Sequence, residues 1–436
     1  MFYELLQIAI GNRDRFSQAP TVEEWRELFA LAQKQAMVGI AFRGVEQLSE
    51  EQRPPKQLLM QWYMVTERIK KMNADLDRKA LAVAEKFRGE GFPGVVLKGQ
   101  GIAKLYVLRD NDDENDNCHP EENIAQHNDE RLTISEANSQ QPTANLSIYR
   151  TPGDIDIWLF GERKEILDYV RRHVPDCKPV YHHVDFPVVE GLDIEVHFTP
   201  SWMNSPVTNR RLQQFFMGDR LEVKGDRLEV KGDRLEVKGD GLEVKGDGLE
   251  VKGDGLEVIG HLEGNTTHYT LNAKQAYTEL PVPSLAFNRV YILVHIYRHL
   301  FAEGIGLRQL LDYYFVLCQG FTEEEREETM RVLRSLKMER FASAVMWVLQ
   351  AVYGMDDRYL LVAPDEREGG FLLDEIMLAG NFGQYDERLQ HEQGESALHW
   401  GWRKVVRNFR FVRSYPSEVL WSPFFKLWHY FWRKGL

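Results

Sequence analysis

The sequence has few cysteines and no long hydrophobic run. Its three cysteines in 436 residues, Cys118, Cys177 and Cys318, form no C-x-x-C pair. Their scarcity argues against a disulfide framework or a zinc-thiolate site and fits a reducing compartment. No uninterrupted run of about 18 apolar residues occurs, so we expect no membrane-spanning helix. The first residues lack a basic leader, so we expect no signal peptide and a cytoplasmic protein.

The negative charge of the chain is confined to two segments. The formal net charge is −13. Residues 109–147 contain ten acidic and two basic side chains, and residues 218–260 contain twelve acidic and eight basic ones. The rest of the chain is therefore close to neutral, and the overall acidity gives no reason to expect a basic partner.

Helical regions stand at both ends of the chain. Apolar residues recur at helical spacing in residues 1–90 and again in residues 261–436. Residues suited to helix N-caps mark several of the expected starts: Thr21, with Glu24 completing a capping box, Ser284 and Thr322.

Residues 91–217 have a different sequence pattern. Short Val- and Ile-rich strands are expected at 95–97, within "GDIDIWLF" and within "LDIEVHF", and they alternate with helical stretches. The pattern predicts a small mixed β-sheet. The fold class is therefore α+β, with this sheet flanked by N- and C-terminal helical regions.

Two insertions interrupt this plan. Residues 109–147 are polar and acidic, and we expect them to be disordered because they cannot bury enough apolar surface. Residues 218–259 are six copies of GD(R/G)LEVK or a close variant. Apolar residues two apart exclude a coiled coil. Two interpretations stay open: an antiparallel meander, which sets Glu opposite Glu, and a flexible tandem expansion.

The candidate chemistry begins with two carboxylates on one expected strand. In "TPGDIDIWLF", Asp154 and Asp156 lie two apart, so they project to one side while Ile155 points into a core. Paired carboxylates repel each other and are costly to desolvate, and a divalent cation offsets both costs. Mg²⁺ prefers one or two carboxylates together with substrate phosphates.

Further polar groups could join this pair. Asp193, Glu195 and His197 alternate with apolar residues and share one face of another expected strand. Upstream, the glycine-containing turn "LKGQG" at 97–101 follows a strand and opens a helix, which offers backbone N–H groups to a phosphate.

These segments together resemble the polymerase-beta-like nucleotidyltransferase superfamily. More closely, the chain is similar to a bacterial family of uncharacterised nucleotidyltransferases. The matching segments are "LKGQG" (97–101), "RTPGDIDIW" (150–158), "IEVHF" (194–198) and "HLFAEGIGLRQLLDYYFVL" (299–317). The resemblance implies a nucleotidyltransferase core at 91–217 and transfer of a nucleoside monophosphate from an NTP to a hydroxyl on a small molecule, a saccharide or a protein.

The resemblance also implies roles for individual residues. Asp154 and Asp156 would hold Mg²⁺ and the triphosphate, and Glu195 would be a further metal ligand or a base. The phosphate side would be formed by four residues: Lys98, Gly99, Arg150 and Gly153.

Several of these residues have ordinary structural interpretations. Lys98 could form an ion pair with a core carboxylate, Arg150 could cap a loop, and Asp193 competes with Glu195. His295 and His299 lie one helical turn apart but lack the glutamate of a zinc-protease motif. Arg308 and Asp312 have the spacing of an ion pair on a helix.

Two questions about function also stay open. Gln100 stands where the superfamily usually has serine or glycine, which favours a catalytically inactive regulatory or antitoxin-like binding module as the alternative. The C-terminal segment combines six aromatic residues at helical spacing with basic ones. We expect a core-packing helix there, with a peripheral membrane or protein contact as the alternative, and we expect no nucleic-acid partner.

Overall fold

The computed structural model describes residues 1–107, 145–189, 191–218, 279–389 and 395–434, together with six strands between Leu228 and Thr270. The acidic insertion at 109–147 lies outside the described residues except for its last three. Among the described residues, no helix combines the length and the hydropathy needed to cross a bilayer.

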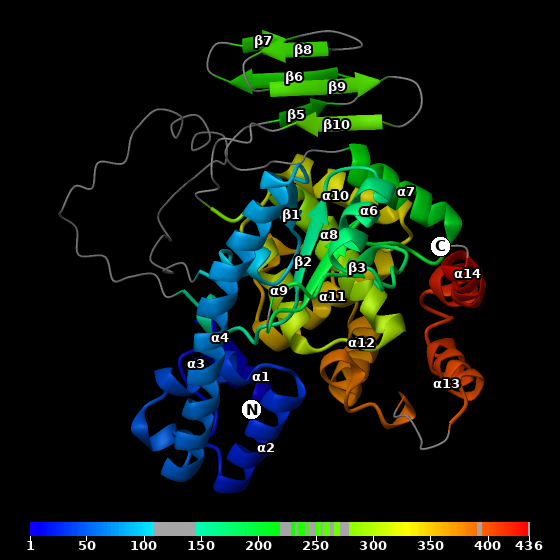
Figure 1. Ribbon diagram of the computed structural model, residues 1–436. Coiled ribbons are helices and arrows are strands. Elements are labelled where there is room, and N and C mark those ends of the chain that lie inside the picture. The colour runs from blue at the N-terminus through cyan, green and yellow to red at the C-terminus, as the bar shows by residue number, and fades with distance from the viewer. Residues whose placement is uncertain are drawn as a thin grey trace, which may run out of the picture.

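The N-terminal region is helical, as expected. Its helices are α1 (Phe2–Ala9), α2 (Val22–Lys34), α3 (Val38–Gln47) and α4 (Lys56–Gly89). The capping box of Thr21 and Glu24 at the start of α2 is confirmed. Helix α4 is one continuous helix of 34 residues. It runs from the N-terminal helices to the β-sheet (Figure 1), so its first half packs with α2 and α3 and its second half covers the sheet.

A four-stranded mixed sheet follows α4. Its strands are β1 (Gly94–Val96), β2 (Ile155–Leu159), β3 (His183–Asp185) and β4 (Ile194–His197), in the order β1-β2-β4-β3. Strands β2 and β4 are parallel, and both outer pairings are antiparallel. Three helices belong to this region: α5 (Gln100–Ala103), α6 (Arg163–His173) and α7 (Pro206–Gly218). The small mixed sheet predicted from the sequence is thus confirmed.

The two faces of the sheet differ in chemistry. The apolar face carries Ile155, Ile157, Val184, Ile194 and Val196, which pack against α6 and the second half of α4 in one buried cluster. Because side chains alternate along a strand, the residues between them project to the other face. That face carries the polar residues of β2, β3 and β4.

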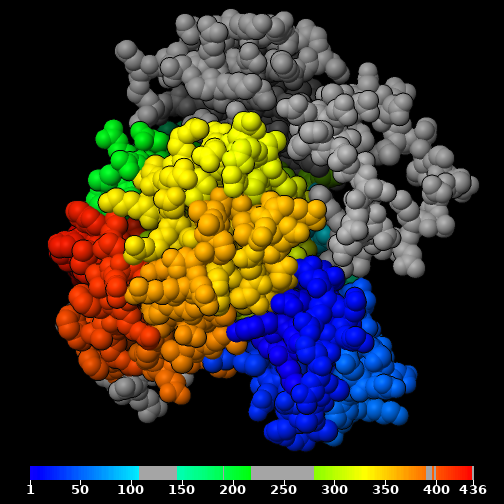
Figure 2. Space-filling model, turned by 180° about the vertical axis from the view of Figure 1, so that it is seen from behind, coloured from blue at the N-terminus to red at the C-terminus, as the bar shows by residue number. Residues whose placement is uncertain are grey.

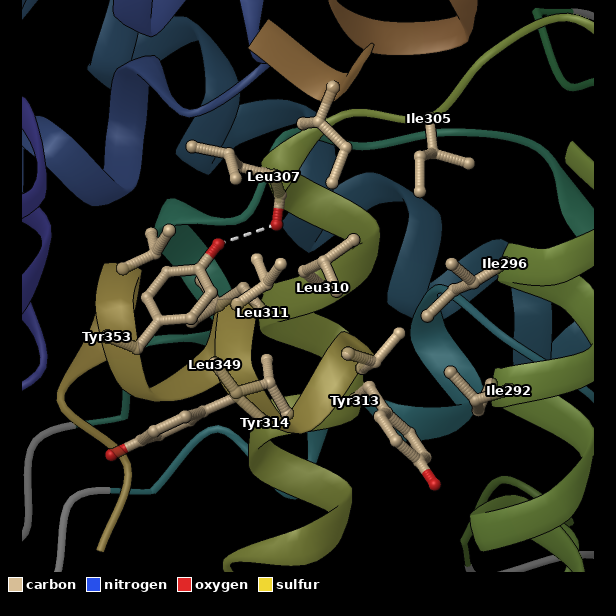
Figure 3. Packing of buried hydrophobic residues seen from close by; sticks show 14 of the residues in the cluster. Ile292, Ile296, Ile305, Leu307, Leu310, Leu311, Tyr313, Tyr314, Leu349 and Tyr353 are labelled. Carbon is tan, nitrogen blue, oxygen red and sulfur yellow. Dashed lines mark hydrogen bonds between the residues drawn. The ribbon is translucent and has the colours of Figure 1, made fainter. Parts of the chain in front are cut away.

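The C-terminal helices cover this polar face. They are α8 (Leu285–Ala302), α9 (Leu307–Leu317), α10 (Glu323–Ser335), α11 (Glu339–Tyr353), α12 (Glu366–Ala379), α13 (Ala397–Phe409) and α14 (Pro416–Lys434). Ser284 and Thr322 accept the expected capping hydrogen bonds. Helices α8, α9 and α11 interlock through aliphatic and aromatic side chains, and the Tyr353 hydroxyl donates to the Leu307 carbonyl at 2.6 Å (Figure 3).

The N- and C-terminal helices share one hydrophobic core. Phe2, Leu5 and Leu6 of α1 belong to the same buried cluster as Val352 and Tyr353 of α11. Seen from behind, the N-terminal helices pack against residues coloured orange in the C-terminal region (Figure 2). Hydrogen bonds reinforce the contact: Gln7 donates to the Val352 carbonyl at 3.2 Å.

The repeat and the residues just after it form two three-stranded antiparallel sheets. One is built from β5 (Leu228–Lys231), β6 (Arg234–Gly239) and β7 (Leu242–Val244), and the other from β8 (Glu250–Gly253), β9 (Leu256–His261) and β10 (Thr266–Thr270). Glu229 is the register partner of Glu236, as the meander interpretation implies. The first copy of the repeat, after Gly218, lies outside the described residues.

Helix α14 differs from the core-packing helix expected from the sequence. It buries only Glu418, Val419 and Ser422, and it exposes most of its large apolar side chains. The aromatic spacing was therefore correctly assigned to a helix, but burial was wrongly inferred from it. One side of α14 packs on the loops around Tyr181 and Trp202, and nothing among the described residues covers the other side.

Candidate functional site

A cavity of about 670 Å³ lies between the polar face of the sheet and the C-terminal helices. The sheet contributes carboxylates and imidazoles from β2, β3 and β4. Helices α8 and α9 contribute cationic and imidazole side chains from the opposite side. The lining includes Lys98, Asp154, Asp156, His182, His183, Asp185, Asp193, Glu195, His197, Trp202, His295, Arg298, His299, Glu303, Arg308 and Phe382.

Strand register brings the predicted carboxylates together. Asp156 on β2 is the register partner of Glu195 on the parallel strand β4. Asp154 stands just before β2, with its side chain 30% exposed, whereas Asp156 is buried. The three candidate acids therefore face one cavity from two neighbouring strands.

Lys98 lies between the two aspartates of the D-x-D motif. Its Nζ is 3.5 Å from Asp154 Oδ2 and 3.1 Å from Asp156 Oδ2. Burial alone would lower the pKa of Lys98, but the charges of Asp156 and Asp154 outweigh it and hold this pKa above its ordinary value. The ion-pair interpretation of Lys98 is the one that the structure shows. The Lys98 ammonium supplies the positive charge between the two aspartates, which a divalent cation could also supply.

His197 links Asp156 to Glu195. Its Nε2 is 2.9 Å from Asp156 Oδ1 and 3.3 Å from Glu195 Oε2. Burial opposes the charged imidazole, but the hydrogen bonds to both carboxylates raise the pKa of His197 to about 9. Burial likewise opposes the ionised Glu195, but the hydrogen bond to His197 and the nearby imidazoles lower the pKa of Glu195 to about 2. An acid this strong is poorly suited to act as a base near neutral pH.

Two further imidazoles extend this cluster. His183 Nδ1 lies 3.2 Å from Glu195 Oε2 and 3.0 Å from His182 Nε2. Burial lowers the pKa of His182 well below its ordinary value, and the neighbouring His183 lowers it further. Burial also lowers the pKa of His183, against the attraction of Glu195. Both rings are therefore neutral near pH 7 and can offer a nitrogen lone pair.

A guanidinium faces the cluster from α8. Arg298 stacks over the ring of Trp202, and no hydrogen bond or ion pair holds it among the residues that the structure describes. Burial lowers the pKa of Arg298 to about 9, and Glu418 and Glu303 offset this only in part. A partly buried cation without a close counter-charge is suited to receive an anionic ligand.

Arg308 supplies a second cation from α9. Its Nη1 donates to the carbonyls of Thr151 and Pro152 at 3.1 and 3.2 Å. A Cβ on Gly153 would lie 3.4 Å from that nitrogen, which is an ordinary van der Waals contact, so the approach does not require glycine. Phe382, whose φ of +51° is uncommon for a residue with a side chain, lies against the same guanidinium.

Arg150 is engaged elsewhere. Its Nε and Nη2 donate to the two carboxylate oxygens of Asp312 at 2.7 and 2.8 Å, and Tyr106 donates to the same carboxylate. Asp312 therefore pairs with Arg150. The helical spacing of Arg308 and Asp312 suggested an ion pair between those two residues instead. Arg150 does not line the large cavity, and it lines a small recess together with Gly99.

The glycine turn has the conformation that its sequence suggested. Gly99 has φ +59°, in the region that favours glycine, and it caps α5. A Cβ on Gly101 would lie 2.2 Å from the Val96 carbonyl oxygen, so this glycine allows the turn to close against β1. Helix α5 has four residues, and Gly99 lines only the small recess beside Asp154.

The remaining candidates lie at the edges of the cavity. Asp193 is exposed, and its carbonyl accepts from the Ile155 amide at 2.9 Å. His295 and His299 line the cavity from α8, and their rings contact each other. They belong to none of the groups of described residues whose donor atoms converge closely enough for a metal ion.

Sequence reasoning missed His182, His183 and Arg298. The adjacent histidines stand at the start of a strand, and their alternation with Val184 and Asp185 places His183 on the polar face. Arg298 stands between His295 and His299 in "HIYRH". One helical turn containing three basic or imidazole side chains is a signal for an anion site, but it was considered only as a zinc motif.

Comparison with protein families supports the resemblance seen in the motifs. A family described as uncharacterised nucleotidyltransferases matches residues 21–109 and 261–354. The matched segments include Lys98, Arg298 and Arg308, whereas Asp154, Asp156 and Glu195 lie between them. No curated protein and no solved structure shows significant similarity to the chain.

Proposed function

We propose that this protein is a nucleotidyltransferase that uses a divalent cation, Mg²⁺ in the first instance, to transfer a nucleoside monophosphate from an NTP to a hydroxyl acceptor. The observation that carries the proposal is the register of β2 and β4, which sets Asp156 beside Glu195 with Asp154 at the cavity mouth. The family match favours the same chemistry.

The donor set fits a divalent cation. Asp156 Oδ2 is buried and accepts no hydrogen bond among the described residues, although Lys98 lies 3.1 Å away. Carboxylate oxygens of this kind are the ligands that Mg²⁺ prefers. Asp154, Asp156 and Glu195 would hold the ion. When bound, it would neutralise phosphate charge and polarise the reacting phosphoryl group.

The other lining residues would bind and orient the substrate. Arg298 and Arg308 face the carboxylates across the cavity and would receive the phosphates. The acceptor oxygen would attack the α-phosphorus and form a new P–O bond as its proton passes to solvent. The bond from the α-phosphorus to the bridging oxygen would break, and pyrophosphate would leave. The low pKa of Glu195 favours its role as a ligand over that of a base.

The direct test is calorimetric titration of each of the four NTPs with Mg²⁺, followed by a search for transfer of label from α-³²P-NTP. We expect magnesium-dependent binding that Asp154→Ala/Asp156→Ala abolishes. Asp193→Asn, an exposed acid on the same cavity, serves as the control and should bind as the parent does. Absence of NTP binding by the folded parent would favour the inactive binding module.

A further inference from the structure

The histidine-rich half of the cavity brings imidazole nitrogens and carboxylate oxygens close together. Five donor atoms form a continuous chain across β2, β4 and β3. The successive separations are 2.9 Å from Asp156 Oδ1 to His197 Nε2, 3.3 Å on to Glu195 Oε2, 3.2 Å to His183 Nδ1 and 3.0 Å to His182 Nε2. The chain turns within a small volume, because the donor atoms of His182, His183 and His197 all lie within 4.8 Å of one another.

These separations match the edges of a coordination shell. An ion that binds nitrogen or oxygen at about 2.0–2.2 Å holds neighbouring ligands about 3 Å apart. Two overlapping groups, Asp156 with Glu195 and His197, and His183 with Asp185 and Glu195, also converge closely enough to share an ion. Glu195 belongs to both of these groups, and its Oε2 lies 3.2 Å from His183 Nδ1 and 3.3 Å from His197 Nε2.

We propose that this half of the cavity binds a divalent transition-metal ion through imidazole nitrogen, with His182, His183 and His197 as its main ligands and the Glu195 carboxylate beside them. Imidazole suits ions such as Zn²⁺ and Fe²⁺, whereas Mg²⁺ prefers an all-oxygen shell. The inference rests on the proposed function and refines it by naming the class of metal.

The second nitrogen of His183 supports this assignment. Its Nε2 lies 3.7 Å from Asp185 Oδ1, on the side away from Glu195. A histidine that binds metal usually directs its other ring nitrogen to a carboxylate or carbonyl, which fixes the ring and its tautomer. Asp185 is therefore the positioning residue of the site, and it needs no contact with the ion.

The rival explanation is a hydrogen-bond chain without metal. Two neutral imidazoles, a carboxylate and a third imidazole can pass hydrogen bonds along the same path. The two explanations differ in what Co²⁺ does. Cobalt in an imidazole-containing site of low coordination number absorbs visible light far more strongly than cobalt surrounded by six oxygens.

The test is Co²⁺ titration of the metal-stripped full-length protein, followed by visible absorption and by metal analysis of the purified protein. We expect one strongly absorbing Co²⁺ per chain that a large excess of Mg²⁺ does not displace. His183→Gln and His197→Gln should each abolish the absorption. Asp185→Asn should weaken binding by about 10–100-fold. His173→Gln, the same substitution on α6 outside the cavity, should leave it unchanged.

The possible outcomes separate this inference from the proposed function. Weak absorption, displacement by equimolar Mg²⁺, or bands that survive His183→Gln in a folded protein would each overturn the transition-metal site. Nucleotidyl transfer with Mg²⁺ by the same preparations would keep the proposed function intact in that case. Strong bands without any transfer would support the metal site and count against the transferase. His182→Gln provides a further ligand variant should another histidine variant fail to fold.

An independent observation concerns helix α14. Leu420, Phe424, Leu427 and Phe431 recur at helical spacing, and each is more than half exposed. Trp421 and Trp428 widen this stripe, which we call the α14 stripe. A contiguous exposed apolar surface of this kind is uncommon on a soluble protein without a partner.

The charge around the α14 stripe indicates the partner. Helix α14 carries three exposed cations, Lys426, Arg433 and Lys434, and its one acid, Glu418, is buried. An exposed aromatic face on a helix that carries exposed cations and no exposed acid is complementary to an anionic lipid surface, where rings enter the headgroup region and cations meet phosphates. We infer that the α14 stripe lies on anionic membranes. This inference does not depend on the enzymatic proposal.

Vesicle flotation tests this second inference. We expect the full chain to bind vesicles of phosphatidylcholine with phosphatidylserine, to release them at high salt, and to bind pure phosphatidylcholine at least tenfold more weakly. Phe424→Ser/Phe431→Ser should abolish binding. The control is Met60→Ser/Met64→Ser, which changes two equally exposed apolar residues on α4. It should leave vesicle binding unchanged. Vesicle binding that survives Phe424→Ser/Phe431→Ser would overturn the membrane inference. A dimer that depends on the α14 stripe, without vesicle binding, would also overturn it.

Discussion

The Lys98 ammonium lies 3.1 Å from the buried carboxylate of Asp156 and bridges it to Asp154. Removing the ammonium by Lys98→Met leaves two carboxylates facing each other in a partly desolvated site. Without metal we expect a loss of about 3–5 kcal/mol in the free energy of unfolding, the usual cost of breaking a buried pair. Divalent cations should restore much of it, because they supply the missing positive charge. Urea unfolding with EDTA or with metal measures both effects.

Lys104→Met is the matched control for that variant. Lys104 pairs with Glu279 at the surface, where an ion pair contributes at most about 1 kcal/mol. Its stability should be close to that of the parent and insensitive to metal. A Lys98→Met protein that metal does not rescue would show that the two aspartates do not share a cation.

The buried pair of Arg150 and Asp312 is expected to be structural. Arg150→Met or Asp312→Asn should each destabilise the protein by about 3–5 kcal/mol, because each leaves one charge buried without its partner. The double variant should lose less than the sum. A double-mutant cycle by urea unfolding measures this coupling, and additive losses would mean that the two groups do not interact.

The pH dependence of stability should report on His197. Its pKa is raised to about 9 in the folded protein, above the ordinary value of 6.5. The stabilisation is therefore complete below pH 6.5 and is lost as the pH rises through 9. In EDTA the melting temperature should fall across this window, and His197→Gln should flatten the fall. A profile that His197→Gln leaves unchanged would assign the loss to another group.

Adjacent glycines in α12 offer a test of packing. A Cβ on Gly369 would lie 2.7 Å from two carbons of Trp347, whereas a Cβ on Gly370 would meet nothing within 4 Å. Gly369→Ala should therefore destabilise by about 1–3 kcal/mol through overpacking. Gly370→Ala should stabilise by about 0.5–1 kcal/mol, because alanine is the better helix former. Thermal unfolding of the two variants gives opposite signs if Gly369 of α12 packs against Trp347 of α11.

The sequence predicted the sheet and its polar face better than it predicted the site. Alternation along "GDIDIW" and "IEVHF" assigns Asp156 and Glu195 to polar faces, because the period of a strand is two. It does not reveal that these strands are parallel neighbours in register, which depends on packing across the whole domain. The same limit applies to Arg150, whose partner Asp312 is 162 residues away.

The residues that were missed have a common cause. Arg298 and His183 acquire their significance from what faces them across the cavity, and a local pattern carries no information about the opposite wall. Burial was likewise misjudged for α14, where helical spacing of aromatic residues is equally compatible with a core and with an exposed surface. The roles assigned to Asp154, Asp156 and Glu195 remain proposals for the experiments above.

The packing of α1 on α11 also affects how the chain folds during its synthesis. Helix α3 can cover part of α1 early, but Phe2, Leu5 and Leu6 cannot complete their burial until residues near Val352 have left the ribosome. At about 5–20 residues per second, this delay amounts to roughly 20–70 s. Helix α1 is thus completed by a helix synthesised much later, so the nascent chain carries a partly uncovered apolar segment during this delay and would be a natural client for ribosome-associated chaperones.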